Sequence, residues 1–228
     1  MHIEPGVVNG AKLVLSYATA AGAVAYSGKL IWDSLVARGA PSLVARSLLA
    51  TLAVFVFFEL LPHFAVGVSE VHFILGTTLL LILGTAPAAI GLALGLLLQG
   101  VLFAPIDLPQ YGMNLTTLLV PLFGIHLMAK RIIAPDTAYV DLSYAQALKL
   151  SAAYQGGVVA WVAFWAIYGS GVGAENLAAV VSFGAAYMLV LIIEPVADLA
   201  ILWAAKTLNR SGRQSALVTP RLFHPQTA

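Results

Sequence analysis

The chain has 228 residues, of which 61% are hydrophobic and 9% charged, and its formal net charge is +1. Soluble domains carry about 25% charged residues, so this composition excludes a soluble globular fold and indicates a polytopic membrane protein. The near-neutral charge argues against a nucleic-acid surface, and the absence of cysteine excludes disulfides, cysteine-based zinc sites, iron–sulfur clusters and thiol nucleophiles.

Apolar segments of membrane-spanning length follow one another along most of the chain. A hydrocarbon core about 30 Å thick needs about 20 apolar helical residues. We therefore expect an all-α membrane protein in which one domain, residues 1–207, precedes a polar cytoplasmic tail, residues 208–228. About seven transmembrane helices are expected, at residues 11–30, 44–62, 71–85, 87–105, 114–133, 149–169 and 176–205.

The basic residues indicate how the chain is oriented. Ten of the 11 lysines and arginines flank the connections after the first and fifth spans or follow the last span. The connections at 61–70, 106–113 and 170–175 contain no lysine or arginine. In a seven-span topology all ten basic residues lie on one side, so the positive-inside rule predicts an outside amino terminus and a cytoplasmic carboxy terminus.

A signal peptide is the alternative interpretation of the first 25 residues. Lys12 and the apolar run after it end in Ala23-Val24-Ala25, which is typical of a cleavage site. However, Glu4 precedes the only basic residue of this segment, and Pro5-Gly6 interrupts the part before the apolar run. We therefore expect the first residues to be retained.

Several familiar motifs are missing. The sequence contains no GxxxxGK[ST] loop for ATP, no HExxH or GxSxG signature and no arginine-rich span of the voltage-sensor type. No constellation of side chains indicates an enzyme. A transporter, a channel or a membrane scaffold remains.

The first two residues, Met1 and His2, can chelate a metal ion. If the α-amine of Met1 binds an ion, the His2 amide nitrogen closes a five-membered ring and His2 Nδ1 closes a six-membered ring. This arrangement supplies three nearly coplanar nitrogens and leaves one planar position open. Planar nitrogen coordination suits Ni(II) and Cu(II), with Co(II) as a neighbour in the affinity series, whereas Ca(II) and Mg(II) prefer oxygen.

A fourth donor has to come from elsewhere in the chain. Three histidines are candidates, His63, His72 and His126, because His224 lies in the expected tail. His72 opens the third span from the outer side, where the amino terminus is expected. For His63 we favour an interfacial pair with Glu59 one helical turn earlier, and for His126 a hydrogen bond between helices.

These residues carry a resemblance to a known family. The opening Met1-His2-Ile3-Glu4-Pro5-Gly6 and the segment His72-Phe73-Ile74-Leu75-Gly76-Thr77 resemble the CbiM/NikM family, the substrate-binding membrane subunits of cobalt and nickel energy-coupling-factor (ECF) transporters. Gln99 and Tyr111-Gly112-Met113-Asn114 are weaker matches to the same family. The similarity extends over most of residues 1–205.

The resemblance implies an S component, the substrate-capture subunit of an ECF-type ABC importer for Ni(II) or Co(II). Its amino terminus would fold back into the bundle, and Met1, His2 and His72 would hold the transported ion in a square plane. Asn114 would orient these ligands, although a helix N-cap is an equal alternative for this residue. No resident cofactor and no enzymatic activity are expected, and the choice between nickel and cobalt stays open.

The resemblance also implies partners and a location. The partners would be a transmembrane coupling subunit and cytoplasmic ATPase subunits on other chains, with a small accessory membrane subunit and the membrane lipid. The location would be the cytoplasmic membrane of a bacterium or archaeon. The missing ATP-binding loop agrees with hydrolysis on separate chains.

Two other functions are compatible with the composition. A stand-alone secondary transporter should show inverted repeats and central carboxylates, and neither is evident in the sequence. A membrane scaffold would not bring His2 and His72 together. Glu194 and Asp198 interrupt the last span, and we expect them near its cytoplasmic end, as a helix exit or partner contact rather than an ion path.

Overall fold

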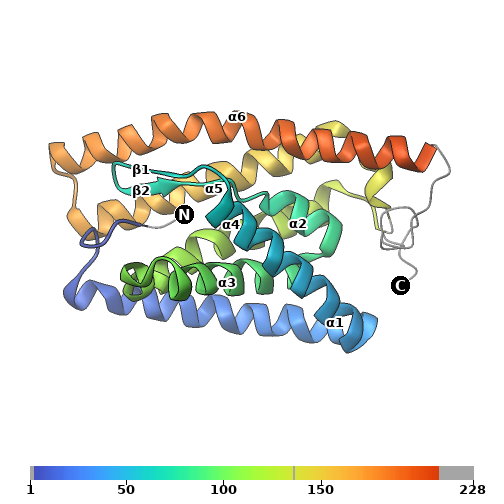
Figure 1. Ribbon diagram of the computed structural model, residues 1–228, viewed down its shortest axis with the longest axis horizontal. Helices are drawn as coiled ribbons and strands as arrows, with labels where there is room; N and C mark the ends of the chain where they lie inside the picture. Colours follow the sequence, from blue (N-terminus) through green and yellow to red (C-terminus); the bar gives the residue numbers. More distant parts are fainter. Residues whose placement is uncertain (1–2, 136, 211–228) are drawn as a thin grey trace.

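The computed structural model describes residues 3–135 and 137–210, and most of them are helical. Figure 1 shows α6 along one side of the molecule and the first part of α1 along the opposite side, with α2 and a two-stranded hairpin between them. The helices are α1 Leu13–Phe55, α2 Gly76–Leu83, α3 Thr85–Leu102, α4 Tyr111–Ile132, α5 Tyr144–Ser170 and α6 Ala174–Arg210. The antiparallel strands are β1 Phe64–Val66 and β2 Ser69–Val71.

The first two expected spans, 11–30 and 44–62, form one helical element that bends sharply. α1 has non-helical backbone at Gly39, with φ 74° and ψ 165°, and Pro41 follows. Figure 1 shows the chain reversing at this bend, and the Arg46 guanidinium reaches back to the Ser34 hydroxyl at 3.3 Å. The expected connection is therefore mostly helical, because apolar residues continue past Lys29 and only the Gly-Ala-Pro segment breaks the helix.

The third expected span, 71–85, is wrong as a membrane-crossing helix. Its beginning continues the extended backbone of β2, and α2 has only eight residues, from Gly76 to Leu83. At 1.5 Å per residue such a helix is about 12 Å long, which is far short of the hydrocarbon thickness. Leu75, with φ 51°, makes the turn between the extended segment and the helix.

The later spans agree with expectation to within a few residues. α3, α4, α5 and α6 correspond to the expected helices at 87–105, 114–133, 149–169 and 176–205. Among the described residues, five helices are long and apolar enough to cross a membrane. The expected fold class, a helical membrane protein, is confirmed, and the orientation of the two termini stays a prediction.

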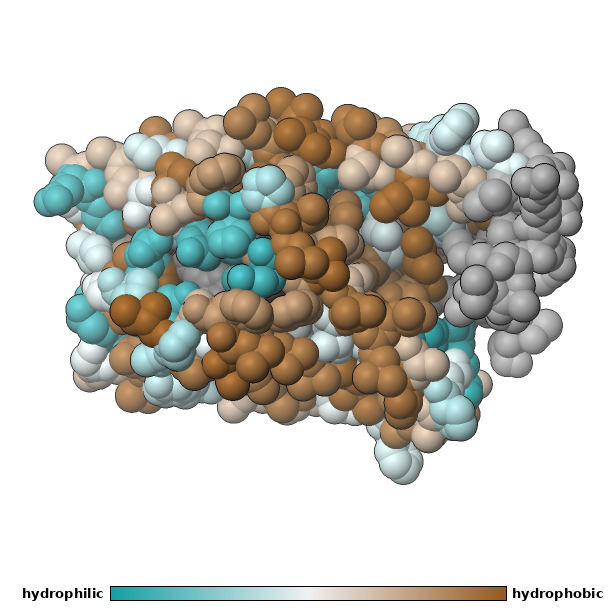
Figure 2. Space-filling model, in the orientation of Figure 1, coloured by the Kyte–Doolittle hydropathy of each residue, from teal (hydrophilic) through white to brown (hydrophobic). Residues whose placement is uncertain are grey.

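Apolar side chains also cover much of the outer surface. α6 presents Leu189, Ile192 and Val196 outward with exposures of 64%, 59% and 61%. Figure 2 shows apolar residues across the middle of the visible face, while hydrophilic residues gather toward the left end and around the hairpin. A surface of this kind is suited to lipid, where apolar exposure carries no penalty.

The short helix α2 is held at both ends by charged side chains from other helices. At its carboxyl end, Arg46 of α1 donates to the Leu83 carbonyl at 2.6 Å. At its amino end, Glu194 and Asp198 of α6 accept hydrogen bonds from Leu75 N–H, at 3.0 Å, and from the Thr78 hydroxyl. A positive charge at the carboxyl end and negative charges at the amino end complement the helix dipole. The expectation that the two carboxylates mark a helix exit or partner contact is wrong, because both are buried in the bundle.

Candidate metal site

The segment that follows the first two residues pairs with the hairpin. Ile3 forms an antiparallel bridge with Ser69 of β2, and Glu4 N–H donates to the Val68 carbonyl at 3.1 Å. Ile3 is completely buried. Ile3 and Glu4 are thus fixed beside the hairpin, with Ile3 inside the bundle. The two residues before it, Met1 and His2, lie outside the described residues.

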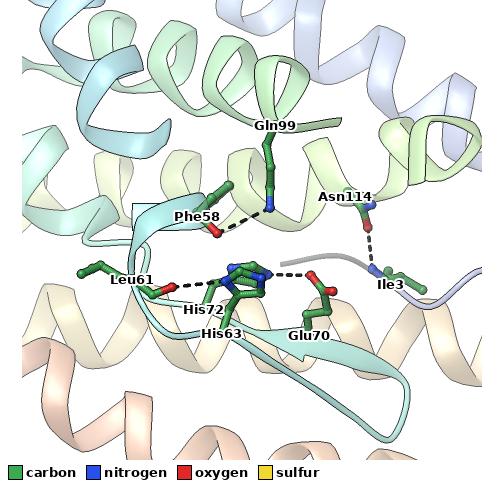
Figure 3. A network of polar contacts seen from close by, with 8 residues as sticks. All are labelled: Ile3, Phe58, Leu61, His63, Glu70, His72, Gln99 and Asn114. Carbon is green, nitrogen blue, oxygen red and sulfur yellow. Dashed lines mark hydrogen bonds and ion pairs between the residues drawn. The ribbon is translucent and has the colours of Figure 1, made fainter. Parts of the chain in front are cut away.

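Asn114 fixes the same segment from α4. Its Oδ1 accepts a hydrogen bond from Ile3 N–H at 2.8 Å, and the side chain is almost completely buried (Figure 3). The alternative interpretation of Asn114 as a helix N-cap is wrong, because α4 begins at Tyr111 and its N-cap is Gln110. The contact places Asn114 beside the backbone of the residue that follows His2.

His72 lies in the extended backbone between β2 and α2. Its imidazole is buried, and Nε2 lies 2.8 Å from Glu70 Oε2. Glu70 is two residues earlier, and alternate residues of extended backbone point to the same face. A helical segment, Val56–Leu60, continues α1, and Figure 3 shows His72 between Glu70 and Phe58 of this segment. Sequence reasoning missed Glu70, although its spacing from His72 is the signal that could have found it.

His63 stacks on His72 and does not pair with Glu59. The two imidazoles are stacked, with ring centroids 4.8 Å apart and an interplanar angle of 12°. The pairing with Glu59 is wrong, because the helical segment ends at Leu60 and Leu61 has extended backbone. His63 Nδ1 lies 3.2 Å from the Leu61 carbonyl oxygen, which orients the ring.

The third candidate histidine is far from this group. His126 Nδ1 contacts Thr85 Oγ1 at 2.7 Å, so the expected hydrogen bond between helices is confirmed. Gln99, the weaker match, is buried and donates to the Phe58 carbonyl at 3.5 Å beside His72 (Figure 3). The structure therefore brings together His72, Asn114 and Gln99, and leaves His126 elsewhere.

The side chains of the described residues do not form a metal site by themselves. Within residues 3–135 and 137–210, no group of three or more histidine, aspartate or glutamate side chains could hold a metal ion. One buried imidazole with a carboxylate partner lies next to the chain segment that leads from the amino terminus. This arrangement can supply one side-chain nitrogen and requires further donors from another part of the chain.

The comparisons with known proteins agree with a metal-transport fold. A family described as "Cobalt uptake substrate-specific transmembrane region" (CbiM) matches residues 2–210. No curated protein matches significantly. The crystal structure of a transition metal transporter is 18% identical with a TM-score of 0.65, and the alignment covers 92% of this chain and 94% of that chain.

The crystal structure of a truncated transition metal transporter is 16% identical with a TM-score of 0.66. That alignment covers 94% of this chain and the whole of the other. At these identities the structural likeness shows the fold alone. The family match extends over most of the chain and therefore shows the family. The chain therefore belongs to the CbiM family of cobalt uptake substrate-specific transmembrane proteins, and is a multi-pass membrane component of metal transport.

Proposed function

We propose that this chain is the substrate-capture subunit of an ECF-type importer for Ni(II) or Co(II). The ion is held by the Met1 α-amine, the His2 amide nitrogen, His2 Nδ1 and the His72 imidazole. The observation that carries the proposal is the position of Ile3, which is buried between Asn114 and β2. Three of the four proposed donors belong to Met1 and His2, which directly precede Ile3 in the sequence.

The His72 environment supports a role as the fourth ligand. Metal-bound histidines commonly donate their other ring N–H to a carboxylate, which fixes the tautomer and raises the basicity of the ligand. With Nε2 directed at Glu70, Nδ1 is the nitrogen that we assign to the metal. The stacked His63 ring holds the imidazole plane from one side.

Asn114 supports the geometry without contacting the ion. Its hydrogen bond to Ile3 N–H fixes the backbone immediately after the proposed His2 chelate. A three-nitrogen chelate from two residues has no freedom to shift its donors independently. An anchor on the next residue therefore orients the whole chelate.

The energy for import is proposed to come from other chains. The sequence has no ATP-binding loop, so the proposed partners are a transmembrane coupling subunit and cytoplasmic ATPase subunits, with a small accessory membrane subunit. The charge pattern predicts that the amino terminus lies outside, which is the side from which an imported ion would arrive. The proposed location is the cytoplasmic membrane of a bacterium or archaeon.

The test is metal content per chain in protein tagged only at the carboxy terminus. Wild type should retain about one Ni(II) or Co(II) per chain after desalting, as expected for one closed chelate. His2→Ala should abolish retention, since it removes the imidazole and with it the six-membered chelate ring. His72→Ala should also lose the ion.

The matched controls are His126→Ala and an alanine inserted after Asn9. His126 is distant from the site, and Asn9 is exposed and lies beyond the Ile3 anchor. Both controls should keep the wild-type metal content. Equal retention by the wild type and His2→Ala would remove His2 from the site and defeat the proposal.

A further inference from the structure

The backbone just after His72 is bound by a carboxylate from the last helix. Glu194 of α6 accepts hydrogen bonds from the N–H groups of Ile74 and Leu75, the latter at 3.0 Å. Each oxygen of the carboxylate takes one of these amides. Glu194 is completely buried and lies 120 positions away from Ile74 in the chain.

The two amides need such an acceptor because of the turn in which they lie. Leu75 has φ 51°, a left-handed conformation that is uncommon for a residue with a branched side chain. This turn ends the extended backbone of β2 and begins α2, so the amides have no partner from either element. Adjacent N–H groups in such a turn form a concave site for an anion, which Glu194 fills.

Glu194 is itself held in place. The Gln155 side chain of α5 donates to its carboxylate, and the Tyr187 hydroxyl donates to Gln155 Oε1 at 2.7 Å. Gln155 and Tyr187 are both buried. Side chains from α5 and α6 therefore fix the position of the carboxylate independently of its contacts with the turn.

The extended segment that contains His72 is thus tied at both ends. At one end Ser69 pairs with Val66 in the hairpin and with Ile3. At the other end Glu194 binds the backbone at Ile74, and only Phe73 separates Ile74 from His72. The contacts at both ends therefore restrain the backbone from which the His72 imidazole extends.

We infer that Glu194 is a positioning residue of the metal site, which sets the direction of His72 without touching the ion. This inference rests on the proposed function, because it requires His72 to be a ligand. It adds α6 to the elements that build the site, which are otherwise the amino-terminal segment, the hairpin and α4. In this role Glu194 does not bind the metal. A carboxylate inside a membrane often marks an ion pathway, and the role inferred here is different.

The test replaces Glu194 by glutamine, which has nearly the same shape. A carboxamide accepts from one amide and directs its own N–H toward the other, so the turn loses one contact. We expect Ni(II) affinity in Glu194→Gln to fall by about tenfold to a hundredfold, as for other residues that orient metal ligands. The visible absorption band of the bound Ni(II) should also shift, because the His72 donor leaves the ligand plane.

Asp198→Asn is the matched control. Asp198 lies one turn further along α6 and accepts from the Thr78 hydroxyl, inside α2 rather than in the turn beside His72. The same chemical change there should leave the absorption band unchanged and the affinity within about threefold of wild type.

Gln155→Leu is a second test variant, which keeps the Glu194 carboxylate and removes its side-chain donor. It should give a smaller loss of affinity than Glu194→Gln, with the same spectral shift. It carries the test if Glu194→Gln does not fold.

The outcomes separate the two proposals. If His72→Ala loses the metal while Glu194→Gln and Gln155→Leu keep wild-type affinity and spectrum, the positioning role is overturned and the proposed function stands. A lower melting temperature in Glu194→Gln with unchanged affinity and spectrum also overturns it, because that is a purely structural role. If wild type and His72→Ala bind Ni(II) equally, the proposed function fails and the inference falls with it.

Discussion

The Ile3 amide donates a hydrogen bond to Asn114 Oδ1 at 2.8 Å, across 111 positions of the chain. Both partners are buried, and Ile3 also pairs with Ser69 of the hairpin. A segment that normally frays in solvent is therefore bound by a helix and a strand at once. This double anchor fixes Ile3 inside the bundle, and the Asn114 half of it can be removed by a single substitution.

Asn114→Leu removes the acceptor at Ile3 and leaves a buried N–H without a partner. We expect the Ni(II) or Co(II) dissociation constant to rise by about tenfold to a hundredfold, because the chelate loses its anchor. Asn114→Asp keeps an acceptor oxygen and should bind more tightly than Asn114→Leu. Competition titration with a chelator of known affinity measures both.

Asn9→Ala is the control for this pair. Asn9 is exposed, and its side chain donates to the Gly6 carbonyl at 3.1 Å. Its affinity should stay within about threefold of wild type, since surface substitutions away from special features have small effects. An unchanged dissociation constant in Asn114→Leu would show that the anchor does not serve metal binding.

Glu70→Ala should weaken metal binding without removing a proposed ligand. Glu70 contacts His72 Nε2 at 2.8 Å, and its loss removes the carboxylate that fixes the tautomer and raises the basicity of the imidazole. We expect a decrease in affinity of about tenfold or more, with Glu70→Gln intermediate because it keeps a hydrogen-bond acceptor. Isothermal titration with Ni(II) provides the measurement.

Glu175→Ala removes a carboxylate of the same kind from an exposed position in the first turn of α6. Its Ni(II) affinity in the same isothermal titration should equal that of wild type. If Glu70→Ala also titrates like wild type, the carboxylate does not tune His72.

Hydropathy predicted the long helices well, because a helix in lipid is apolar on its outer surface as well as in the core. Each long helix is therefore a continuous apolar segment in the sequence. The expected limits of α4 and α5 are therefore close to the observed ones. The same signal failed at 71–85, where Val71, Phe73 and Ile74 suit an extended strand as well as a helix. Apolar length alone cannot distinguish these two conformations.

The parts of the candidate site were predictable to different degrees. His72 was a candidate from its position at the outer end of an expected span and from the resemblance. Glu70 could have been predicted as its partner, because residues two apart in extended backbone lie on the same face. Glu194 was seen as unusual, but its partners at Ile74 and Leu75 could not be inferred. A contact across 120 positions depends on how helices pack, and no local pattern in the sequence encodes it.

Arg46→Met should destabilise the protein at the carboxyl end of α2. The guanidinium donates to the Leu83 carbonyl at 2.6 Å and to the Ser42 carbonyl at 3.1 Å. Methionine keeps the apolar volume but leaves the buried Leu83 carbonyl unpaired, which costs about 1–3 kcal/mol of unfolding free energy. Thermal unfolding in detergent should show a lower midpoint.

Lys29→Met is the matched control for Arg46. Lys29 forms an exposed ion pair with Asp33 at 2.6 Å, a contact of a kind that contributes little to stability. Its unfolding midpoint should match that of wild type. A midpoint for Arg46→Met equal to that of Lys29→Met would mean that α2 needs no charge at its carboxyl end.

Gly91→Ala should destabilise the packing of α3 against α1. A Cβ at Gly91 would lie 2.4 Å from the Ala50 Cβ and 2.7 Å from the Ala50 carbonyl carbon, so the helices would have to separate. Overpacking of this kind costs about 1–3 kcal/mol, which exceeds the gain in helix propensity of about 1 kcal/mol. Gly124→Ala makes the same change in α4 with nothing within 4 Å of the new Cβ, and it should be neutral or slightly stabilising. Thermal unfolding of the two variants in the same detergent checks the difference, and a Gly91→Ala midpoint at or above that of Gly124→Ala would contradict close packing of α1 and α3.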